Sequence, residues 1–186
     1  MVTGPSGAGK GTLIQLVLPR FAELAVTVSA TTRARRPGER DGIDYHFLER
    51  DEFDAKIEAG EFLEWVDYVG NRYGTLRSEI DRLRGAGKAP LLELETEGAL
   101  RVKEDDPRAV TIFVQARVEE LERRLRERAT ESTGEIGERI ALAREQLQQS
   151  DEFDYVVEND DLERAVGELT ELVRGLLSSA GTMARP

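Results

Sequence analysis

The chain has 186 residues, of which 39% are hydrophobic and 34% charged, a balance typical of a globular protein with one substantial core. Its net charge of −11 argues against sequence-independent nucleic-acid binding, which needs a basic surface. With no cysteine and a single histidine, disulfides, thiol catalysis and multi-histidine metal sites are excluded. No apolar run approaches the ~20 residues that cross a membrane, and no charged-then-apolar leader is present, so we expect a cytoplasmic protein without a membrane partner.

Apolar β-branched runs alternate with helical patterns along the chain, which predicts a parallel α/β sheet. The expected strands are 26–29, 90–94, 110–115 and 155–158, and the expected helices are 10–19, 118–128, 136–149 and 162–177. Only Met1, Val2 and Thr3 precede the first loop, which is short for the central strand of such a sheet.

Two segments depart from this alternation. Residues 30–86 combine short β-like pieces at 44–48 and 61–68 with a helical stretch near 51–59. Residues 128–150 are dense in arginine, glutamate and glutamine. Such excursions are typical of parts that close over a substrate. The small, polar residues 179–186 are predicted to form a mobile tail.

A glycine-rich loop occupies residues 4–12 and reads Gly4-Pro5-Ser6-Gly7-Ala8-Gly9-Lys10-Gly11-Thr12. Its glycines let successive backbone N–H groups point at one anion, and the helix predicted to follow presents its positive end to the same anion. Lys10 would reach the outer phosphates of a nucleoside triphosphate. A glycine-rich turn without a ligand is the alternative, and the lysine, the spacing and the helix argue against it.

The residue after Lys10 affects how the protein can bind a metal ion. Loops of this kind usually carry a serine or threonine there, whereas this chain has Gly11, with Thr12 one place later. We therefore expect Mg²⁺ to be held mainly by nucleotide phosphates and water, with Thr12 as the candidate side-chain ligand.

A second anion site is indicated by Arg33, Arg35 and Arg36, three arginines within four positions of an acidic chain. Guanidinium groups bind phosphate oxygens bidentately. For this cluster taken alone, a solvated basic loop is the alternative. Two phosphate-binding regions would give the chain places for the donor and the acceptor of a phosphoryl group.

Further motifs follow in order: the run from Ser29 to Phe47 with its Asp44-Tyr45, then Glu64-Trp65, Tyr73-Gly74-Thr75, Arg128-Ala129-Thr130-Glu131 and Asn159-Asp160-Asp161-Leu162. With the phosphate loop, they make the chain resemble guanylate kinase over nearly its whole length. The resemblance implies an α/β P-loop nucleoside monophosphate kinase fold, with a five-stranded parallel core sheet flanked by helices. It implies a core of residues 1–29, 87–127 and 151–178, a GMP-binding subdomain at 30–86 and a lid at 128–150.

The resemblance also implies which residues bind GMP: Arg33, Arg36, Tyr45 and Tyr73 for its phosphate, and Ser29, Glu64, Thr75 and Glu95 for guanine. A carboxylate accepts from the N1–H and N2–H₂ groups of guanine, and hydroxyls serve its O6 and N7. Adenine would set an unprotonated N1 against the carboxylate, at a cost of about 1–3 kcal/mol per unmet group. Glu95 stands where the family usually has aspartate, so its charge is displaced by one methylene.

On the ATP side, the resemblance implies that residues 4–12 bind the phosphates and that Asn159 and Asp160 lie beside the adenine. It assigns catalytic roles to Lys10, Arg36 and the lid arginines Arg128 and Arg139, because phosphoryl transfer depends on alignment and charge neutralisation. The family's usual glycine is replaced by Ala129, which predicts a strained lid hinge.

Some residues are interpreted without a functional role. Arg124 and Arg126 follow a helical pattern with glutamates, which predicts surface ion pairs of small energetic worth. His46 is interpreted as a surface residue and Trp65 as part of the core.

These patterns predict an enzyme that uses Mg²⁺ and transfers the γ-phosphoryl group of ATP to GMP, which yields ADP and GDP. We expect the enzyme to be a monomer or a homodimer. One alternative is a related P-loop kinase with another phosphorylated acceptor, and the paired Glu64 and Glu95 argue against it. The other is a guanylate-kinase-like interaction module without catalysis, and the intact phosphate loop with Lys10 argues against that.

Overall fold

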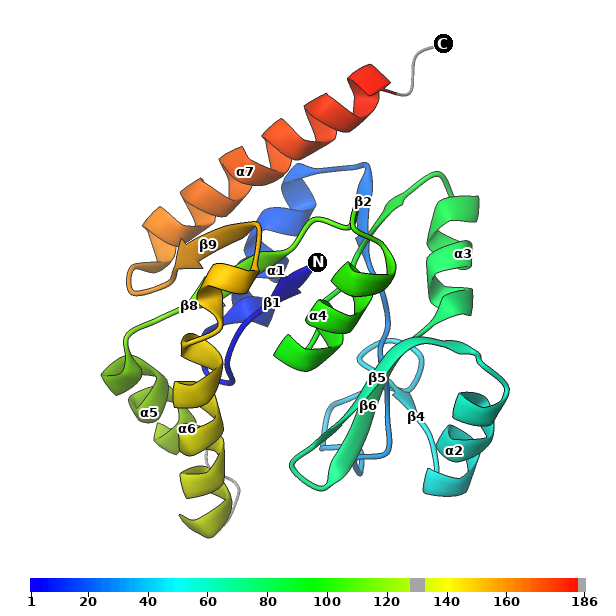
Figure 1. The fold of residues 1–186 in the computed structure, drawn as a ribbon, viewed down its shortest axis with the longest axis vertical. Coiled ribbons are helices and arrows are strands. Elements are labelled where there is room, and N and C mark those ends of the chain that lie inside the picture. The colour runs from blue at the N-terminus through cyan, green and yellow to red at the C-terminus, as the bar shows by residue number, and fades with distance from the viewer. Residues whose placement is uncertain (128–132, 184–186) are drawn as a thin grey trace.

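Two parallel sheets form the centre of the molecule (Figure 1). One contains β1 (Val2–Thr3), β8 (Ile112–Gln115) and β9 (Tyr155–Glu158) in the order β1-β8-β9, and the other pairs β2 (Leu24–Val26) with β7 (Ala89–Leu91). The computed structural model describes residues 1–127 and 133–183. The predicted α/β class with parallel strands is confirmed.

The two parallel sheets meet at Val2. This residue forms a parallel bridge to Glu93, its N–H donates to the Leu92 carbonyl at 2.8 Å, and its carbonyl accepts from the Leu94 N–H at 3.1 Å. On its other side Val2 pairs with Ile112 of β8. A strand of two residues therefore joins both sheets, because its backbone is hydrogen-bonded on both edges.

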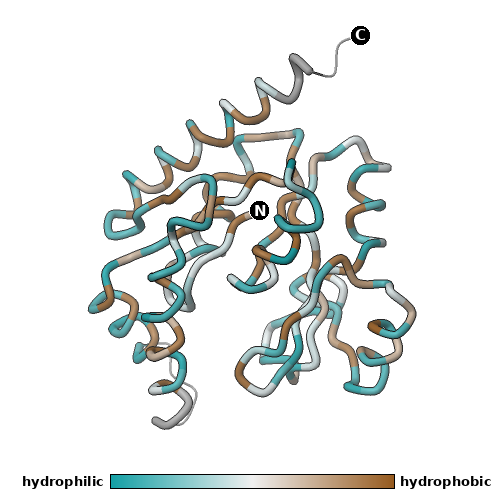
Figure 2. The backbone as a smooth tube through the Cα atoms, in the orientation of Figure 1, coloured by the Kyte–Doolittle hydropathy of each residue, from teal (hydrophilic) through white to brown (hydrophobic). Residues whose placement is uncertain are grey.

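Helices cover both faces of these sheets. They are α1 (Lys10–Val17), α3 (Arg77–Gly85), α4 (Thr96–Asp105), α5 (Val118–Glu127), α6 (Thr133–Leu147) and α7 (Leu162–Met183), with 3-10 turns at Leu18–Arg20 and Ser150–Glu152. Side chains alternate across β8, so that Val114 packs with Leu13 and Leu169 on one face while Phe113 stacks on Phe153 on the other. Hydropathy alternates along α7, as expected of a helix with one apolar face (Figure 2).

A second lobe has its own sheet and core. Its strands β3 (Ala30–Thr31), β4 (His46–Phe47), β5 (Phe62–Tyr68) and β6 (Asn71–Leu76) are ordered β4-β3-β6-β5. Helix α2 (Arg50–Glu58) packs on it through Phe53, whose ring stacks on Phe62 at 4.3 Å. Figure 1 shows this lobe opposite the pair α5 and α6.

Several predicted bounds shift. Strand β9 lies where it was predicted, whereas β2 ends at Val26, where the predicted strand began. Helix α7 continues to Met183, so residues 179–183 are helical where we predicted a tail. Ser178 and Ser179 are compatible with a helical backbone because their hydroxyls donate to the carbonyls of Arg174 and Gly175, four residues earlier. Among the described residues, no helix is long and apolar enough to span a bilayer.

Candidate active site

The glycine-rich loop connects β1 to α1 and is held tightly against the core. Gly4 has φ 136°, and a Cβ there would lie 2.0 Å from the Val114 carbonyl oxygen of β8. Gly9, the residue before α1, has φ 86°, and its Cβ would lie 2.4 Å from Asn159 Nδ2. Both positions require glycine, because a side chain would meet strain and a clash together. The loop thus curls so that the N-terminus of α1 faces the adjoining pocket, where an anion is stabilised.

Lys10 is the first residue of α1, and its Nζ donates to the Gly4 carbonyl at 2.6 Å. It lines both pockets described below. Its ammonium therefore stands where the loop, the α1 N-terminus and the two pockets meet.

Arg124 and Asn159 brace the loop from behind. Asn159 Nδ2 donates to the Ala8 carbonyl at 2.7 Å, and Arg124 donates to the carbonyls of Gly7 at 3.3 Å and Asn159 at 2.9 Å. The prediction of Arg124 as a surface ion pair is wrong in this respect: it pairs with Glu120, but its Nη1 also reaches the Gly7 and Ala8 carbonyls of the loop. Arg126 does pair with Glu122 on the exposed side of α5. Asp160, predicted beside the adenine, binds the backbone N–H and the guanidinium of Arg117 at 2.9 Å each.

Arg139 brings α6 over the loop. Its Nη2 donates to Ser6 Oγ at 2.6 Å, and it lines the phosphate-side pocket together with Tyr68 at the end of β5. The segment predicted as a lid therefore contacts the phosphate loop through its predicted arginine. Arg128 and Ala129 lie outside the described residues.

The phosphate-side pocket is a cavity of about 260 Å³. The glycine-rich loop forms one wall, and the predicted acceptor-phosphate residues Arg33, Arg36, Tyr45 and Tyr73 form the other. Arg33 is oriented by Glu39, which accepts from its Nη2 at 2.8 Å and its Nη1 at 3.1 Å, and its guanidinium lies 5.4 Å from the Tyr45 ring centroid. These hydrogen bonds from Arg33 lower the pKa of Glu39.

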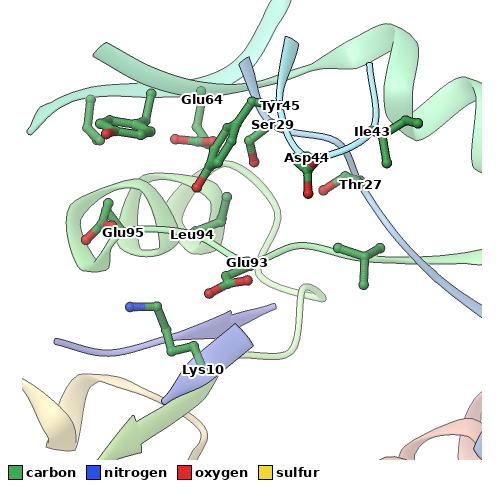
Figure 3. A pocket seen from close by; sticks show the side chains of 14 residues that line it. Lys10, Thr27, Ser29, Ile43, Asp44, Tyr45, Glu64, Glu93, Leu94 and Glu95 are labelled. Carbon is green, nitrogen blue, oxygen red and sulfur yellow. The ribbon is translucent and has the colours of Figure 1, made fainter. Parts of the chain in front are cut away.

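The second pocket, a cavity of about 200 Å³, lies directly beside the first. Ser29, Tyr45, Glu64, Tyr73 and Glu95 line it, as does Glu93. Figure 3 shows Glu93 between Lys10 on one side and Tyr45 and Glu64 on the other. Thr75 lies beside Glu64 as its partner in the β5–β6 register. The structure therefore brings together the four residues predicted to read a base.

One oxygen atom of this group, Glu95 Oε2, is buried without a hydrogen-bond partner. Buried polar atoms normally find partners, so such atoms in a pocket point to a ligand. Burial raises the pKa of Glu64 to about 7, while the neighbouring Thr75 and the Arg101 guanidinium act in the opposite direction. A buried carboxylate of this kind is a strong acceptor for a donor-bearing edge of a ligand.

Two residues of the site were missed from the sequence. Glu93 lines both pockets, and its oxygens would lie 3.6 Å from a Cβ at Gly11. The alternation Leu92-Glu93-Leu94-Glu95 was the available signal, since it places both glutamates on one face. Tyr68 had no signal beyond its place at the end of a strand.

Within the described residues no group of three or more acidic or histidine side chains forms a metal cage. The hard oxygen donors that line the phosphate-side pocket include Thr12 of the loop and Glu93.

His46 faces inward and is not purely a surface residue. Its Nε2 lies 3.5 Å from Glu79 Oε1, while the same carboxylate accepts from the Val28 N–H at 3.1 Å and pairs with Arg82. Trp65 is partly buried against the second lobe's core, as predicted, with the Arg72 guanidinium 5.6 Å from its ring centroid.

A phosphate loop opens a helix beside a pocket that arginines also line, and the adjoining pocket contains a buried carboxylate. Together these features define a P-loop phosphotransferase acting on nucleotides. The family model for guanylate kinase matches residues 1–176. The chain is 49% identical over 179 residues to a guanylate kinase of Rubrobacter xylanophilus, covering 96% of this chain and 94% of the relative. It is 48% identical over 174 residues to a guanylate kinase of a Synechococcus strain, covering 93% and 80%. The solved guanylate kinase of Anaplasma phagocytophilum is 28% identical and superposes with a TM-score of 0.74 over 94% of this chain and 82% of that one. The chain belongs to the guanylate kinase family.

Proposed function

We propose how the two pockets divide the substrates of this guanylate kinase, which transfers the γ-phosphoryl group of ATP to GMP and yields ADP and GDP. ATP would place its phosphates on residues 4–12, and GMP would lie in the pocket of Glu64. The observation that carries this assignment is that the two pockets share Lys10, Tyr45, Tyr73, Glu93 and Glu95. A donor phosphate in one and an acceptor phosphate in the other would therefore meet beside Lys10.

The acceptor phosphate would be held by Arg33, Arg36, Tyr45 and Tyr73. Arg33 supports this because its guanidinium is already oriented by Glu39 and by the ring of Tyr45, so little rotamer entropy remains to be lost on binding. Tyr45 also reaches the base pocket, which would place the nucleoside between the phosphate and the base readers.

Guanine would be read by Glu64 and Thr75 on neighbouring strands and by Ser29 on the same side of the pocket, with Glu95 on the facing side (Figure 3). The N1–H and N2–H₂ donors would satisfy the buried carboxylate of Glu64, and the Oγ1 of Thr75 beside it would serve an acceptor or donor of the base. Adenine would leave Glu64 unpaired, which is the condition under which a polar site discriminates strongly.

During transfer, Lys10, Arg36 and Arg139 would neutralise charge that spreads over the transferring phosphoryl oxygens. Arg128 is proposed for the same role from the sequence alone. Mg²⁺, bound with ATP, would supply further charge neutralisation on the phosphates. The donors present fit this ion: Thr12 and Glu93 offer the hard oxygen ligands that Mg²⁺ prefers, and the phosphates and water would provide the rest.

We further propose that the two parallel sheets act as one five-stranded core through Val2, with residues 30–86 as the GMP-binding subdomain and 128–150 as the lid. Contact between Arg139 and Ser6 supports the lid assignment. The cytoplasmic location and the choice between monomer and homodimer stay predictions.

A coupled assay for ADP formation with GMP, AMP, CMP and UMP tests this function. GMP should exceed AMP by about 10²-fold or more in kcat/KM, because the site is built around a hydrogen-bonding carboxylate. Glu64→Gln should raise KM for GMP and leave KM for ATP nearly unchanged. Comparable turnover of AMP by the unmodified protein would contradict the assignment of the base pocket.

A further inference from the structure

The carboxylate of Glu64 packs against the first turn of α4, at Gly98. A Cβ on Gly98 would lie 2.5 Å from Glu64 Oε2, 3.2 Å from its Cδ and 3.6 Å from Val66 Cγ1. Gly98 is buried, and it is not among the glycines with positive φ. The requirement for glycine at this position is therefore steric and concerns one functional group, the carboxylate.

We propose that Gly98 is a specificity-determining positioning residue, whose missing side chain creates the space in which the Glu64 carboxylate meets guanine. This inference rests on the proposed role of Glu64 as a base reader. Glycine lowers the stability of a helix relative to alanine, so its place in α4 has no benefit for the helix itself. What it permits is the close approach of strand β5 and of the Glu64 side chain.

Helix α4 cannot easily retreat from an added methyl group. Arg101, one turn further along α4, donates to the Trp65 carbonyl of β5 at 2.7 Å and pairs with Glu97. Ala99 and Val102, on the face of α4 that adjoins Gly98, pack in the core with Leu94 and Phe113. The helix is thus fixed to the strand beside Glu64 and to the core behind it.

The strand that carries Glu64 is fixed as well. Strand β5 pairs with β6 at Glu64 itself, opposite Thr75, and at Trp65, opposite Gly74, and a bulge separates Glu64 from Phe62. The far end of the Glu64 side chain is the part with freedom to move. A methyl group on residue 98 would therefore push the carboxylate away from α4 and into the pocket that Glu64 lines (Figure 3).

The electrostatics point in the same direction. The first N–H groups of α4 have no helical partners and carry the positive end of its dipole. With glycine at position 98, the carboxylate can lie directly against this turn, which stabilises its charge after GMP has excluded water. A displaced carboxylate would lose this stabilisation of its charge, and it would also lose its alignment with guanine.

Gly98→Ala tests the proposal, with Gly167→Ala as the matched control. Gly167 lies in helix α7, and a Cβ there would meet nothing within 4 Å. Gly98→Ala should raise KM and the calorimetric Kd for GMP by roughly 10–100-fold and reduce the preference for GMP over AMP by about 10-fold, while KM for ATP changes less than about 2-fold. Its melting temperature should stay close to that of the unmodified protein, and Gly167→Ala should leave all kinetic constants unchanged.

A double variant separates displacement of the carboxylate from general damage. Glu64→Asp shortens the side chain by one methylene, which relieves the overlap with a methyl group at position 98. Gly98→Ala combined with Glu64→Asp should therefore lose less GMP affinity than the product of the two single losses. Equal loss of GMP and ATP affinity in Gly98→Ala, or independent losses in the double variant, would overturn the proposal.

The outcomes also distinguish this inference from the function on which it rests. If Glu64→Gln weakens GMP binding and Gly98→Ala does not, the positioning role fails and the base-reading role stands. If Glu64→Gln leaves GMP binding intact, the base-reading role itself fails, and with it the role of Gly98.

Discussion

Burial of Glu64 creates a free-energy cost that depends on pH. Its pKa is raised to about 7 in the folded protein, from an ordinary value of 4.5. Between these values the folded state binds more protons than the unfolded state, so stability falls as pH rises from about 4.5 to 7. Above pH 7 the folded protein carries a buried charge that the unfolded chain holds in water.

Glu64→Gln should therefore stabilise the protein more at pH 8 than at pH 5, by about 2 kcal/mol. Urea denaturation at the two pH values measures this difference. Glu58→Gln, at an exposed position of α2, serves as the control. An equal change in stability at both pH values would show that Glu64 is not desolvated.

Lys10 should matter for the reaction and little for the fold. Lys10→Ala should lower kcat by about 10²–10³-fold, the scale of losing one preorganised donor to transition-state charge. The melting temperature should hardly change, because the hydrogen bonds of Lys10 to described residues go to the loop carbonyls of Gly4 and Pro5. Lys56→Ala, which removes a surface pair with Glu61, should retain full activity. Activity of Lys10→Ala near that of the unmodified protein would revive the non-catalytic interaction module.

At the residue scale, the sequence predicted what depends on local spacing. The loop at 4–12 is of this kind, since its glycines, its lysine and the next helix are contiguous. The bracing role of Arg124 could not be predicted, because its partners Gly7 and Asn159 lie 117 and 35 residues away in sequence. The glutamates at helical spacing from Arg124 indicated surface ion pairs instead.

The β5–β6 hairpin shows an unusual turn at the scale of an element. Tyr68 pairs with Asn71, which leaves the two-residue loop Val69-Gly70, with φ of 46° and 75°. A turn with positive φ at both positions suits asparagine followed by glycine, whereas a β-branched residue is strained there.

Val69→Asn should therefore stabilise the protein by about 1 kcal/mol. Thermal unfolding measures the gain. Val69→Ala keeps a Cβ without the asparagine preference for this conformation and should gain less. A lower melting temperature for Val69→Asn would mean that the valine side chain contributes packing that outweighs its backbone strain.

Helices α3 and α4 were not predicted. Both start without a side-chain cap, after Leu76 and Glu95, so the usual serine, threonine or aspartate signal is missing. Strand β2 was predicted two residues too late because Val26 to Ser29 has strand-like composition. In the folded chain the Val28 N–H is bound by Glu79, a residue of α3, and this contact replaces a strand partner.

For the whole molecule, we predict that two parts close over the substrates independently. The second lobe and helix α6 lie on opposite sides of the molecule (Figure 1). Both line the phosphate-side pocket, the second lobe through Arg33 and α6 through Arg139. Bound phosphates offset the repulsion between these arginines, so each substrate should draw in the part that contacts it.

Hydrogen exchange with GMP, with an ATP analogue and with both tests this prediction. Protection should rise in residues 30–76 with GMP alone, and in 133–147 mainly when the triphosphate is present. The buried strand β8 should exchange equally slowly in every state and serves as the internal control. Identical exchange of both segments in all states would contradict independent closure.

The attachment of the phosphate loop to distant parts of the chain has a consequence for biosynthesis. Residues 1–9 are translated well before Val114, on which Gly4 packs, and before Asn159, which donates to the Ala8 carbonyl. At roughly 5–20 residues per second, these residues wait on the order of ten seconds or more for Asn159 to be translated. During that time Val2, and then Leu13 and Ile14, would be exposed to water, although they are buried in the finished core. The nucleotide site is therefore among the last features to form during translation, and the nascent N-terminal segment is a natural client for a chaperone that shields apolar chains.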